Sequence, residues 1–273
     1  MKIIVAGIVV TAFLFLGTHK GSASLLEDNC GTTRCPLRVR RVVGGNVAER
    51  FSNPWMVMVL TANGFTCGGS LITSRFVLTA AHSISEFPAI KVRLGVFDRD
   101  ICEHTYEVNI DQSISHPQFT KRYMRKYDIA LLRMAQEVVF SDYIRPICLL
   151  VNQKVEIVYP NYKLTGWGRT INDRMSKILH TTNIFNVGLH ICNLKFGVQT
   201  DQSHICAGSF SSNACTGDGG SPLSVELDYE GTIREFQLGI ASYVSAHCTG
   251  LGVFTNVTHY INWIKYTILA NSD

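Results

Sequence analysis

The sequence predicts an all-β protein, and two observations carry this prediction. Short runs rich in β-branched and aromatic residues recur from Val42 onward and are separated by turn residues. Only the C-terminal stretch has apolar residues at helical spacing. The chain has 273 residues, enough for one large all-β domain or two small ones. Short strands at regular spacing are typical of a β-sandwich or a β-barrel.

The individual elements follow from the same patterns. Strands are expected at 55–60, 70–79, 91–94, 129–134, 236–242 and 252–257. A helix is expected over about 259–270, because apolar residues recur there at helical spacing: Ile261, Ile264, Ile268 and Leu269. Residues 25–41 form a short, Arg-rich lead that lies outside the predicted domain.

Residues 1–24 have the pattern of a secretory signal peptide. Lys2 precedes an apolar run from Ile3 to Leu16, and small residues follow up to Ser24. The alternative, a membrane anchor, needs roughly 20 apolar residues, which is longer than this run. We therefore expect this segment to be removed and the protein to be secreted into the extracellular space.

Composition narrows the set of partners. The net charge is +4, and the Lys and Arg residues form no long block. A charge so small and so scattered does not favour nucleic acid or a membrane surface as a partner. The sequence also has no glycine-rich phosphate loop, and we expect neither a cofactor nor a metal.

The chain has nine cysteines, and an extracellular protein is expected to pair most of them. Because the number is odd, at least one has no partner within the chain. They are Cys30, Cys35, Cys67, Cys102, Cys148, Cys192, Cys206, Cys215 and Cys248. The sequence Asn256-Val257-Thr258 is an acceptor site for N-glycosylation at Asn256.

Four segments match the parts needed for acyl transfer by a serine. That chemistry requires a hydroxyl, an imidazole that takes its proton, and a buried carboxylate that orients the imidazole. The segments are Leu78-Thr79-Ala80-Ala81-His82, Tyr127-Asp128-Ile129-Ala130-Leu131-Leu132, Thr165-Gly166-Trp167-Gly168 and Cys215-Thr216-Gly217-Asp218-Gly219-Gly220-Ser221-Pro222. Taken alone, His82 could be structural and Asp128 could be a turn residue. Together and in this order the segments are highly specific.

From Val42 to Trp263 the chain resembles the chymotrypsin/trypsin-like serine protease family, and within it a non-catalytic serine protease homologue of arthropod type. The resemblance implies two six-stranded antiparallel β-barrels with a cleft between them. A protease domain is then expected at 42–273, with barrels at about 42–145 and 146–258 and a C-terminal helix at about 259–270. His82 and Asp128 would come from the first barrel and the nucleophile loop from the second.

The nucleophile loop departs from the family pattern G-D-S-G-G-P. Here the loop reads G-D-G-G-S-P, which puts Gly219 at the position of the reactive serine. The resemblance gives His82 the role of base, Asp128 that of orienting carboxylate, and Gly217 and Gly219 that of oxyanion donors. Since glycine has no side chain, we expect the protein to be catalytically inactive.

An active serine endopeptidase remains the alternative, if Ser221 substitutes or Gly219 is a sequence error. Ser221 lies up to roughly 7 Å further along an extended chain. A nucleophile must come within about 2.6–3.2 Å of its base. Pro222 also restricts the backbone of Ser221 to extended conformations. A third possibility, a carbohydrate- or surface-binding module, has no motif in its favour.

Residues 25–41 resemble an activation segment. The sequence Arg41-Val42-Val43-Gly44-Gly45 matches a zymogen junction, and the resemblance implies that a freed Val42 ammonium pairs with Asp218. For this segment, the alternative interpretation is a solvated basic linker. If it is an activation segment, the expected partner is an activating protease of trypsin-like or dibasic specificity. The resemblance also implies an extracellular protein partner in a protease cascade, such as one of innate immunity.

The resemblance also assigns a specificity pocket and disulfides. The pocket comprises Asn213, Ser242, Tyr243, Val244 and Gly252, and Val244 would narrow it. The implied bridges are Cys192–Cys206, Cys215–Cys248, and Cys148 with Cys30 or Cys35. The family bridge from Cys67 is lost, because Ser83 follows the histidine. Cys102 has no family counterpart, and its partner is open between Cys35 and Cys67.

Overall fold

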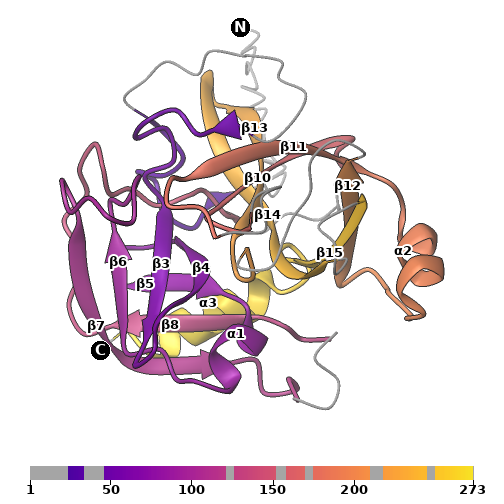
Figure 1. The fold of residues 1–273 in the computed structure, drawn as a ribbon, viewed down its shortest axis with the longest axis horizontal. Helices are drawn as coiled ribbons and strands as arrows, with labels where there is room; N and C mark the ends of the chain where they lie inside the picture. Colours follow the sequence, from indigo (N-terminus) through magenta and orange to yellow (C-terminus); the bar gives the residue numbers. More distant parts are fainter. Residues whose placement is uncertain are drawn as a thin grey trace, which may run out of the picture.

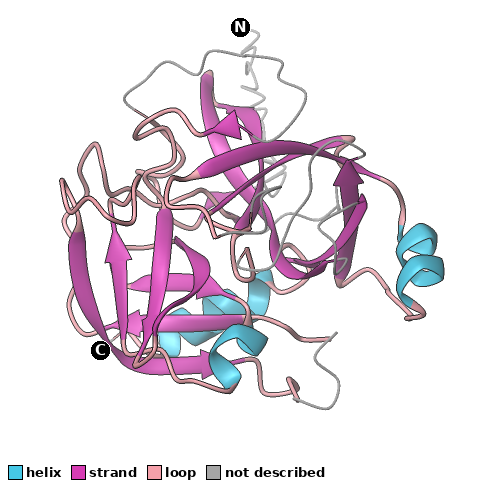
Figure 2. Ribbon diagram, viewed as in Figure 1, coloured by secondary structure: helices cyan, strands magenta, loops and turns pink. Residues whose placement is uncertain are grey.

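The computed structural model describes residues 24–33, 46–120, 126–151, 158–169, 175–209, 218–244 and 250–272. These residues form two antiparallel barrels that lie side by side, with helices at their margins (Figure 1, Figure 2). The predicted all-β class, with two six-stranded barrels and a C-terminal helix, is confirmed. No helix in the described part of the chain is long and apolar enough to cross a membrane.

The first barrel closes on itself in the order β3-β4-β5-β8-β7-β6. Its strands are β3 (Met56–Thr61), β4 (Gly64–Leu71), β5 (Phe76–Thr79), β6 (Lys91–Leu94), β7 (Tyr106–Ser115) and β8 (Ala130–Met134). Every pair is antiparallel, and apolar side chains such as Val57, Val77 and Leu132 are fully buried inside it. This packing stabilises the barrel through the area it removes from water.

The second barrel has the strand order β10-β13-β14-β15-β12-β11, and pairing of β10 with β11 closes it. Its strands are β10 (Asn161–Gly166), β11 (His180–Asn186), β12 (His204–Ser209), β13 (Pro222–Tyr229), β14 (Thr232–Val244) and β15 (Gly250–Asn256). The two-residue strand β2 (Asn46–Val47) adds to β11. Leu223, Phe236 and Phe254 pack in the interior.

The lead segment is docked on the second barrel. Its strand β1 (Ser24–Leu25) pairs with β9 (Leu150–Val151), and a disulfide joins Cys30 to Cys148. The guanidinium of Arg234 in β14 donates to the carbonyls of Asp28 and Cys30. Hydrogen bonds therefore hold this segment in place in addition to the covalent bridge.

The helices were only partly predicted from the sequence. Helix α3 (Ile261–Ala270) falls within the expected 259–270, and Ile264 is its buried residue. Helices α1 (Ala81–Ser85) and α2 (Leu189–Phe196) were not predicted. Helix α1 is a single turn, and only Cys192 of α2 is buried, so neither carries the apolar stripe that marks a helix in a sequence.

One predicted strand is in fact two. The run 70–79 contains the end of β4 and all of β5, separated by a turn at 72–75. The Thr73 hydroxyl accepts hydrogen bonds from the backbone amides of Arg75 and Phe76, at 3.2 and 3.0 Å. A threonine that bonds nearby backbone amides in this way favours a turn over a continuous strand.

Contacts between the two barrels fix their relative position. A buried cluster combines Met56 and Leu78 from the first barrel with Trp167 and Ile240 from the second. Across the same interface the Ser70 hydroxyl in β4 donates to the amide oxygen of Gln237 in β14, at 2.6 Å. The shared packing sets the distance between α1 and the loop before β13.

Candidate active site

His82 lies in the one-turn helix α1, directly after β5. Its backbone amide donates to Oδ1 of Asp128 at 2.8 Å, and its Nδ1 lies 2.7 Å from Oδ2 of the same carboxylate. The His82 side chain is 28% exposed, whereas that of Asp128 is 2% exposed. The buried carboxylate therefore orients an imidazole whose other nitrogen, Nε2, is not used by Asp128.

Asp128 is positioned by the residues around it. Tyr127 has a φ of 57°, a left-handed conformation that is uncommon for a residue other than glycine. Its ring stacks on that of His116, with centroids 5.0 Å apart. The hydroxyl of Ser242 in β14 donates to Asp128 Oδ2. Three donors thus satisfy the buried carboxylate, which offsets the free-energy cost of burying its charge.

The environment of His82 shifts its pKa. Burial alone would lower the pKa of this imidazole, but the hydrogen bond and the negative charge of Asp128 raise it more strongly. The net result is a pKa above the ordinary value. The imidazolium–carboxylate state is therefore favoured over a wider pH range than for a free histidine.

Gly219 faces His82 from the other side of the cleft. A β-carbon built on Gly219 would lie 3.1 Å from His82 Nε2. The Gly219 carbonyl accepts a hydrogen bond from the Gly68 amide at 2.9 Å, which ties the loop to β4. The backbone thus brings position 219 to the base, and a side chain there is what the site lacks.

Ser83 was singled out in the sequence only as the residue that removes a disulfide. In the structure its hydroxyl lies 3.1 Å from His82 Nε2, the nitrogen that Asp128 leaves unused. The same hydroxyl is 3.1 Å from the position of a β-carbon on Gly219. No motif marks this role, because it depends on the side-chain rotamer and on the approach of the loop from the second barrel.

Ser221 lies away from this arrangement. Its side chain is fully buried, and its hydroxyl has no hydrogen-bond partner in the part of the chain that the structure describes. It points at Gly68, where a β-carbon would come within 2.2 Å of the Ser221 Oγ. The hydroxyl is therefore enclosed between the two barrels.

Asp218 precedes Gly219 and is 8% exposed. Its Oδ1 accepts a hydrogen bond from the Gly168 amide at 2.9 Å. Arg41 and Val42, and also Gly217, fall outside the described residues. The pairing of Val42 with Asp218 and the oxyanion role of Gly217 remain predictions.

The expected specificity pocket is described in part. Ser242 contacts Asp128, as above, and the ring of Tyr243 packs edge-on against Phe196 with centroids 5.5 Å apart. Val244 lies opposite Gly252 across the β14–β15 pair. Asn213 and the side chain of Val244 fall outside the described part of the structure. That Val244 narrows the specificity pocket therefore remains a prediction.

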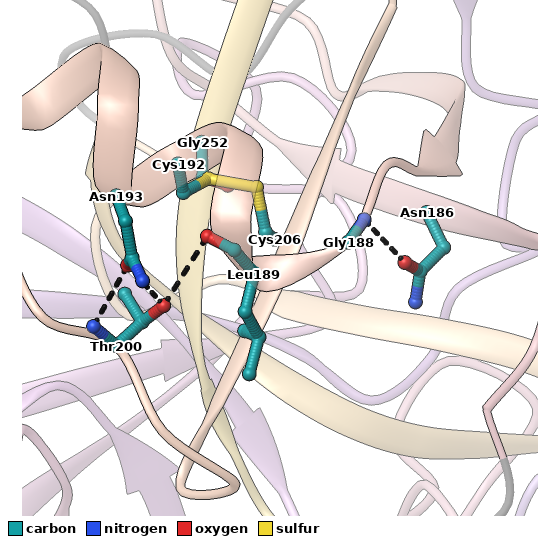
Figure 3. The surroundings of a disulfide bond; sticks show 8 residues. All are labelled: Asn186, Gly188, Leu189, Cys192, Asn193, Thr200, Cys206 and Gly252. Carbon is teal, nitrogen blue, oxygen red and sulfur yellow. Dashed lines mark hydrogen bonds between the residues drawn. A yellow bond between two sulfur atoms is a disulfide. The ribbon is translucent and has the colours of Figure 1, made fainter.

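The disulfides were predicted from the family resemblance. The structure pairs Cys192 of α2 with Cys206 of β12 (Figure 3). It also selects Cys30 as the partner of Cys148. Around the first bridge, the Asn193 amide oxygen accepts from both the backbone amide and the hydroxyl of Thr200, at 2.8 and 2.6 Å. These bonds anchor the loop that follows α2. The predicted bridge Cys215–Cys248 and the pairing of Cys35 lie outside the described residues.

Two described cysteines are not in a disulfide. Cys102 is exposed, and Cys67 is buried beside the active site. The possible Cys67–Cys102 bridge is therefore not formed. Burial raises the pKa of the Cys67 thiol to about 11, even though hydrogen bonds with Thr79 and Ser83 lower it. The thiol is protonated at neutral pH and hence unreactive.

Asn256, the expected acceptor for a glycan, is buried in the structure. The residue is 8% exposed, and its amide nitrogen donates to the Gln202 carbonyl at 2.8 Å. A glycan on this nitrogen would replace one of the two hydrogens of the amide. Glycosylation at Asn256 remains a prediction.

The described residues contain no group of three or more His, Cys, Asp or Glu side chains that could hold a metal ion. Outside the active site, two such residues form a pair: Nδ1 of the buried His204 lies 3.1 Å from Oδ1 of Asp201.

Comparison with known proteins extends the picture from the site to the whole chain. A family model described as Trypsin matches residues 42–264. Melanization protease 1 and Spaetzle-processing enzyme, both of Drosophila melanogaster, are 34% and 32% identical to this chain. The alignments cover 84% and 88% of this chain and 66% and 68% of theirs. The chain thus spans about two thirds of the length of these curated relatives.

A solved structure agrees with the sequence comparisons. The crystal structure of Drosophila Grass, titled a clip serine protease of the Toll pathway, matches with a TM-score of 0.76 at 27% identity. The match covers 89% of this chain and 75% of the Grass chain.

Proposed function

This chain belongs to the trypsin family of serine proteases, and from that premise we propose that it is a secreted homologue that binds within an extracellular protease cascade but does not cleave peptides. Relatives named Melanization protease 1 and Spaetzle-processing enzyme support a setting in arthropod innate immunity. Its proposed partners are an activating protease and a further extracellular protein of the cascade.

The observation that carries the inactivity is the empty position at Gly219. A β-carbon there would lie 3.1 Å from His82 Nε2, so a side chain at this position would begin beside the base, and glycine supplies no hydroxyl. In an unrelated serine protease, removing the nucleophile lowers turnover about 10⁶-fold. That factor corresponds to roughly 8 kcal/mol of lost transition-state stabilisation. A protease weakened this far does not cleave proteins on a biological timescale.

The rival function, an active serine endopeptidase through Ser221, has little support. Its hydroxyl is fully buried and points at Gly68. Reaching a substrate carbonyl would require the loop to separate from β4, which the hydrogen bond from the Gly68 amide to the Gly219 carbonyl opposes.

We infer that regulation by cleavage is retained. A trypsin-like or dibasic-specific protease would cut after Arg41 and free the Val42 ammonium. Asp218, buried at the base of the loop, is the acceptor proposed for this ammonium. In this proposal cleavage does not switch on catalysis; it changes the surface that a partner recognises.

The test compares three preparations: the uncleaved protein, the protein cleaved after Arg41, and an Arg41→Gln variant treated with the same protease. None should hydrolyse a library of peptide amides. The cleaved form alone should change the rate of zymogen activation in a reconstituted extracellular cascade. Turnover of about 1 s⁻¹ or more, within the ordinary range for enzymes, would reject inactivity. Cascade rates that are the same with all three preparations would reject the binding role.

A further inference from the structure

The His82 imidazole has a hydroxyl partner although Gly219 provides none. Asp128 engages Nδ1 at 2.7 Å, so in the neutral ring Nδ1 carries the proton and Nε2 is the acceptor. The Ser83 hydroxyl lies 3.1 Å from that acceptor and is the group that can donate to it. A serine, a histidine and a buried aspartate are therefore connected in series.

The surroundings leave this hydroxyl accessible. Ser83 and His82 are half-buried rather than enclosed. A side chain at position 219 would begin 3.1 Å from the Ser83 Oγ, so the glycine leaves open the space that a substituent would fill. A small electrophile can reach Ser83 Oγ from this side.

Two neighbouring groups support reactivity at Ser83. Cys67 is in hydrogen-bonding contact with Ser83, and burial keeps its thiol protonated, so it does not compete as a nucleophile. The amides of Gly220 and Ser221 are used, since they donate to Ala241 and Asp218 carbonyls at 2.9 Å. The Gly219 amide has no backbone acceptor among the described residues and is available to an oxyanion.

We propose that Ser83 is a surrogate nucleophile, activated by His82 and Asp128, that reacts with small activated acyl and phosphonyl esters but not with peptide bonds. Its oxygen is displaced from the place that a residue-219 hydroxyl would occupy, because it lies 3.1 Å from the β-carbon position there. A misplacement of about 1 Å can lower a rate about 100-fold. A peptide held along the cleft cannot follow the displaced oxygen, whereas a small ester can.

The chemical step is balanced for a fluorophosphonate. The Ser83 oxygen forms a bond to phosphorus as its proton passes to His82 Nε2, and the phosphorus–fluorine bond breaks to release fluoride. For an aryl ester, the serine oxygen bonds to the acyl carbon as its proton passes to His82 Nε2, and the bond to the phenolate breaks; the leaving phenolate takes the proton from the imidazolium. Water then attacks the acyl carbon as its proton passes to His82 Nε2. The bond from the acyl carbon to Ser83 Oγ breaks, His82 returns the proton to Ser83 Oγ, and the carboxylic acid is released.

The experiment treats the intact protein with a fluorophosphonate and locates the adduct by peptide fragmentation mass spectrometry. We expect one adduct per molecule, on Ser83. Hydrolysis of p-nitrophenyl butyrate should fall about 100-fold in Ser83→Ala, the scale of a positioned nucleophile and base. Ser85→Ala is the matched control, because Ser85 lies on the same helix and its hydroxyl donates to the His82 carbonyl at 2.9 Å. It should keep both the adduct and the rate.

Blocking thiols with iodoacetamide beforehand removes the exposed Cys102 as a competing site. Absence of an adduct, an adduct on another residue, or an unchanged ester rate in a folded Ser83→Ala protein would each overturn the proposal. A lower rate with rising pH would also overturn it, because His82 must be neutral to accept the proton. The outcome is independent of the cascade role, which is read from zymogen activation rather than from ester chemistry.

Discussion

His82 is held by two hydrogen bonds to one carboxylate, from its backbone amide and from Nδ1. Oδ2 of that carboxylate also accepts a hydrogen bond from the Ser242 hydroxyl. The base and its orienting partner are thus bound into the fold, while the position facing them is a glycine. The predicted base and its orienting carboxylate are therefore present, whereas the predicted nucleophile position has no side chain.

The pKa of His82 should lie above its ordinary value of about 6.5. The ion pair with Asp128 stabilises the folded state fully below that ordinary value, and this contribution is lost as the pH rises through the raised pKa. NMR titration of the imidazole should show the raised midpoint, and Asp128→Asn should bring it down. A midpoint unaffected by Asp128→Asn would contradict the arrangement.

Replacing Gly219 with serine should restore a nucleophile within reach of His82. Ser221→Gly is added in a second variant, because the enclosed Ser221 hydroxyl abuts Gly68 and the family has glycine there. After cleavage at Arg41, the double variant should cleave next to small or medium apolar residues, since Asn213 cannot neutralise a buried cation. Profiling on a peptide library measures this preference. A strong preference for Arg would show that the pocket is misassigned.

At the site, the motifs predicted His82, Asp128 and Gly219 because each sits in a distinctive local sequence, and the structure brings the three together, while their catalytic roles remain predictions. The role of Ser83 could not be found in this way. Ser83 lies in α1, and its hydroxyl comes close to position 219 only because the packing of the two barrels places the loop of the second barrel beside this helix. The buried, unpartnered state of the Ser221 hydroxyl has the same origin.

Among the elements, the strand with regular alternation of burial was predicted best. The predicted strand 91–94 coincides with β6, since its buried and exposed residues alternate. Strand β11 was missed because most of its residues are polar and only Ile184 is buried. Helix α2 was missed for a different reason: its apolar residues do not form one stripe, since Leu189 and Phe196 are only partly buried against the barrel and Leu194 is exposed, while the Cys192–Cys206 bridge attaches the helix covalently.

The docked lead segment allows a prediction about processing. After cleavage at Arg41, residues 25–41 should stay attached through Cys30–Cys148 and leave on reduction. Release should be faster in Arg234→Ala, which loses the bonds to the Asp28 and Cys30 carbonyls. Mass spectrometry of the cleaved product with and without reductant measures this. Loss of the segment without reductant would show that the tether is absent.

For the molecule as a whole, the two barrels act as one unit because their interface is packed. The cluster that contains Met56 and Trp167 and the Ser70–Gln237 hydrogen bond both join the two barrels. Sequence patterns predicted the barrels through resemblance to a family, but not which side chains would meet between them.

If Val42 pairs with Asp218 after cleavage, partner affinity should differ between the cleaved and uncleaved proteins. Asp218→Asn should abolish the difference, because the amide cannot pair with an ammonium as a carboxylate does. Binding to the isolated cascade partner, measured by calorimetry, tests this. Equal affinities for both forms of the unmodified protein would indicate that cleavage no longer has a regulatory effect.

The buried Asp128 also limits how such a protein can change over generations. Any substitution that removes a partner of this carboxylate leaves a charge stranded in the interior, at a cost of about 3–5 kcal/mol of folding stability. A serine-to-glycine change at position 219 leaves no buried charge unpaired, since the atoms nearest to a β-carbon there belong to His82 and Ser83 and not to Asp128. Selection for folded protein alone therefore acts to keep His82 while Asp128 is present, and it places no such constraint on the residue at position 219.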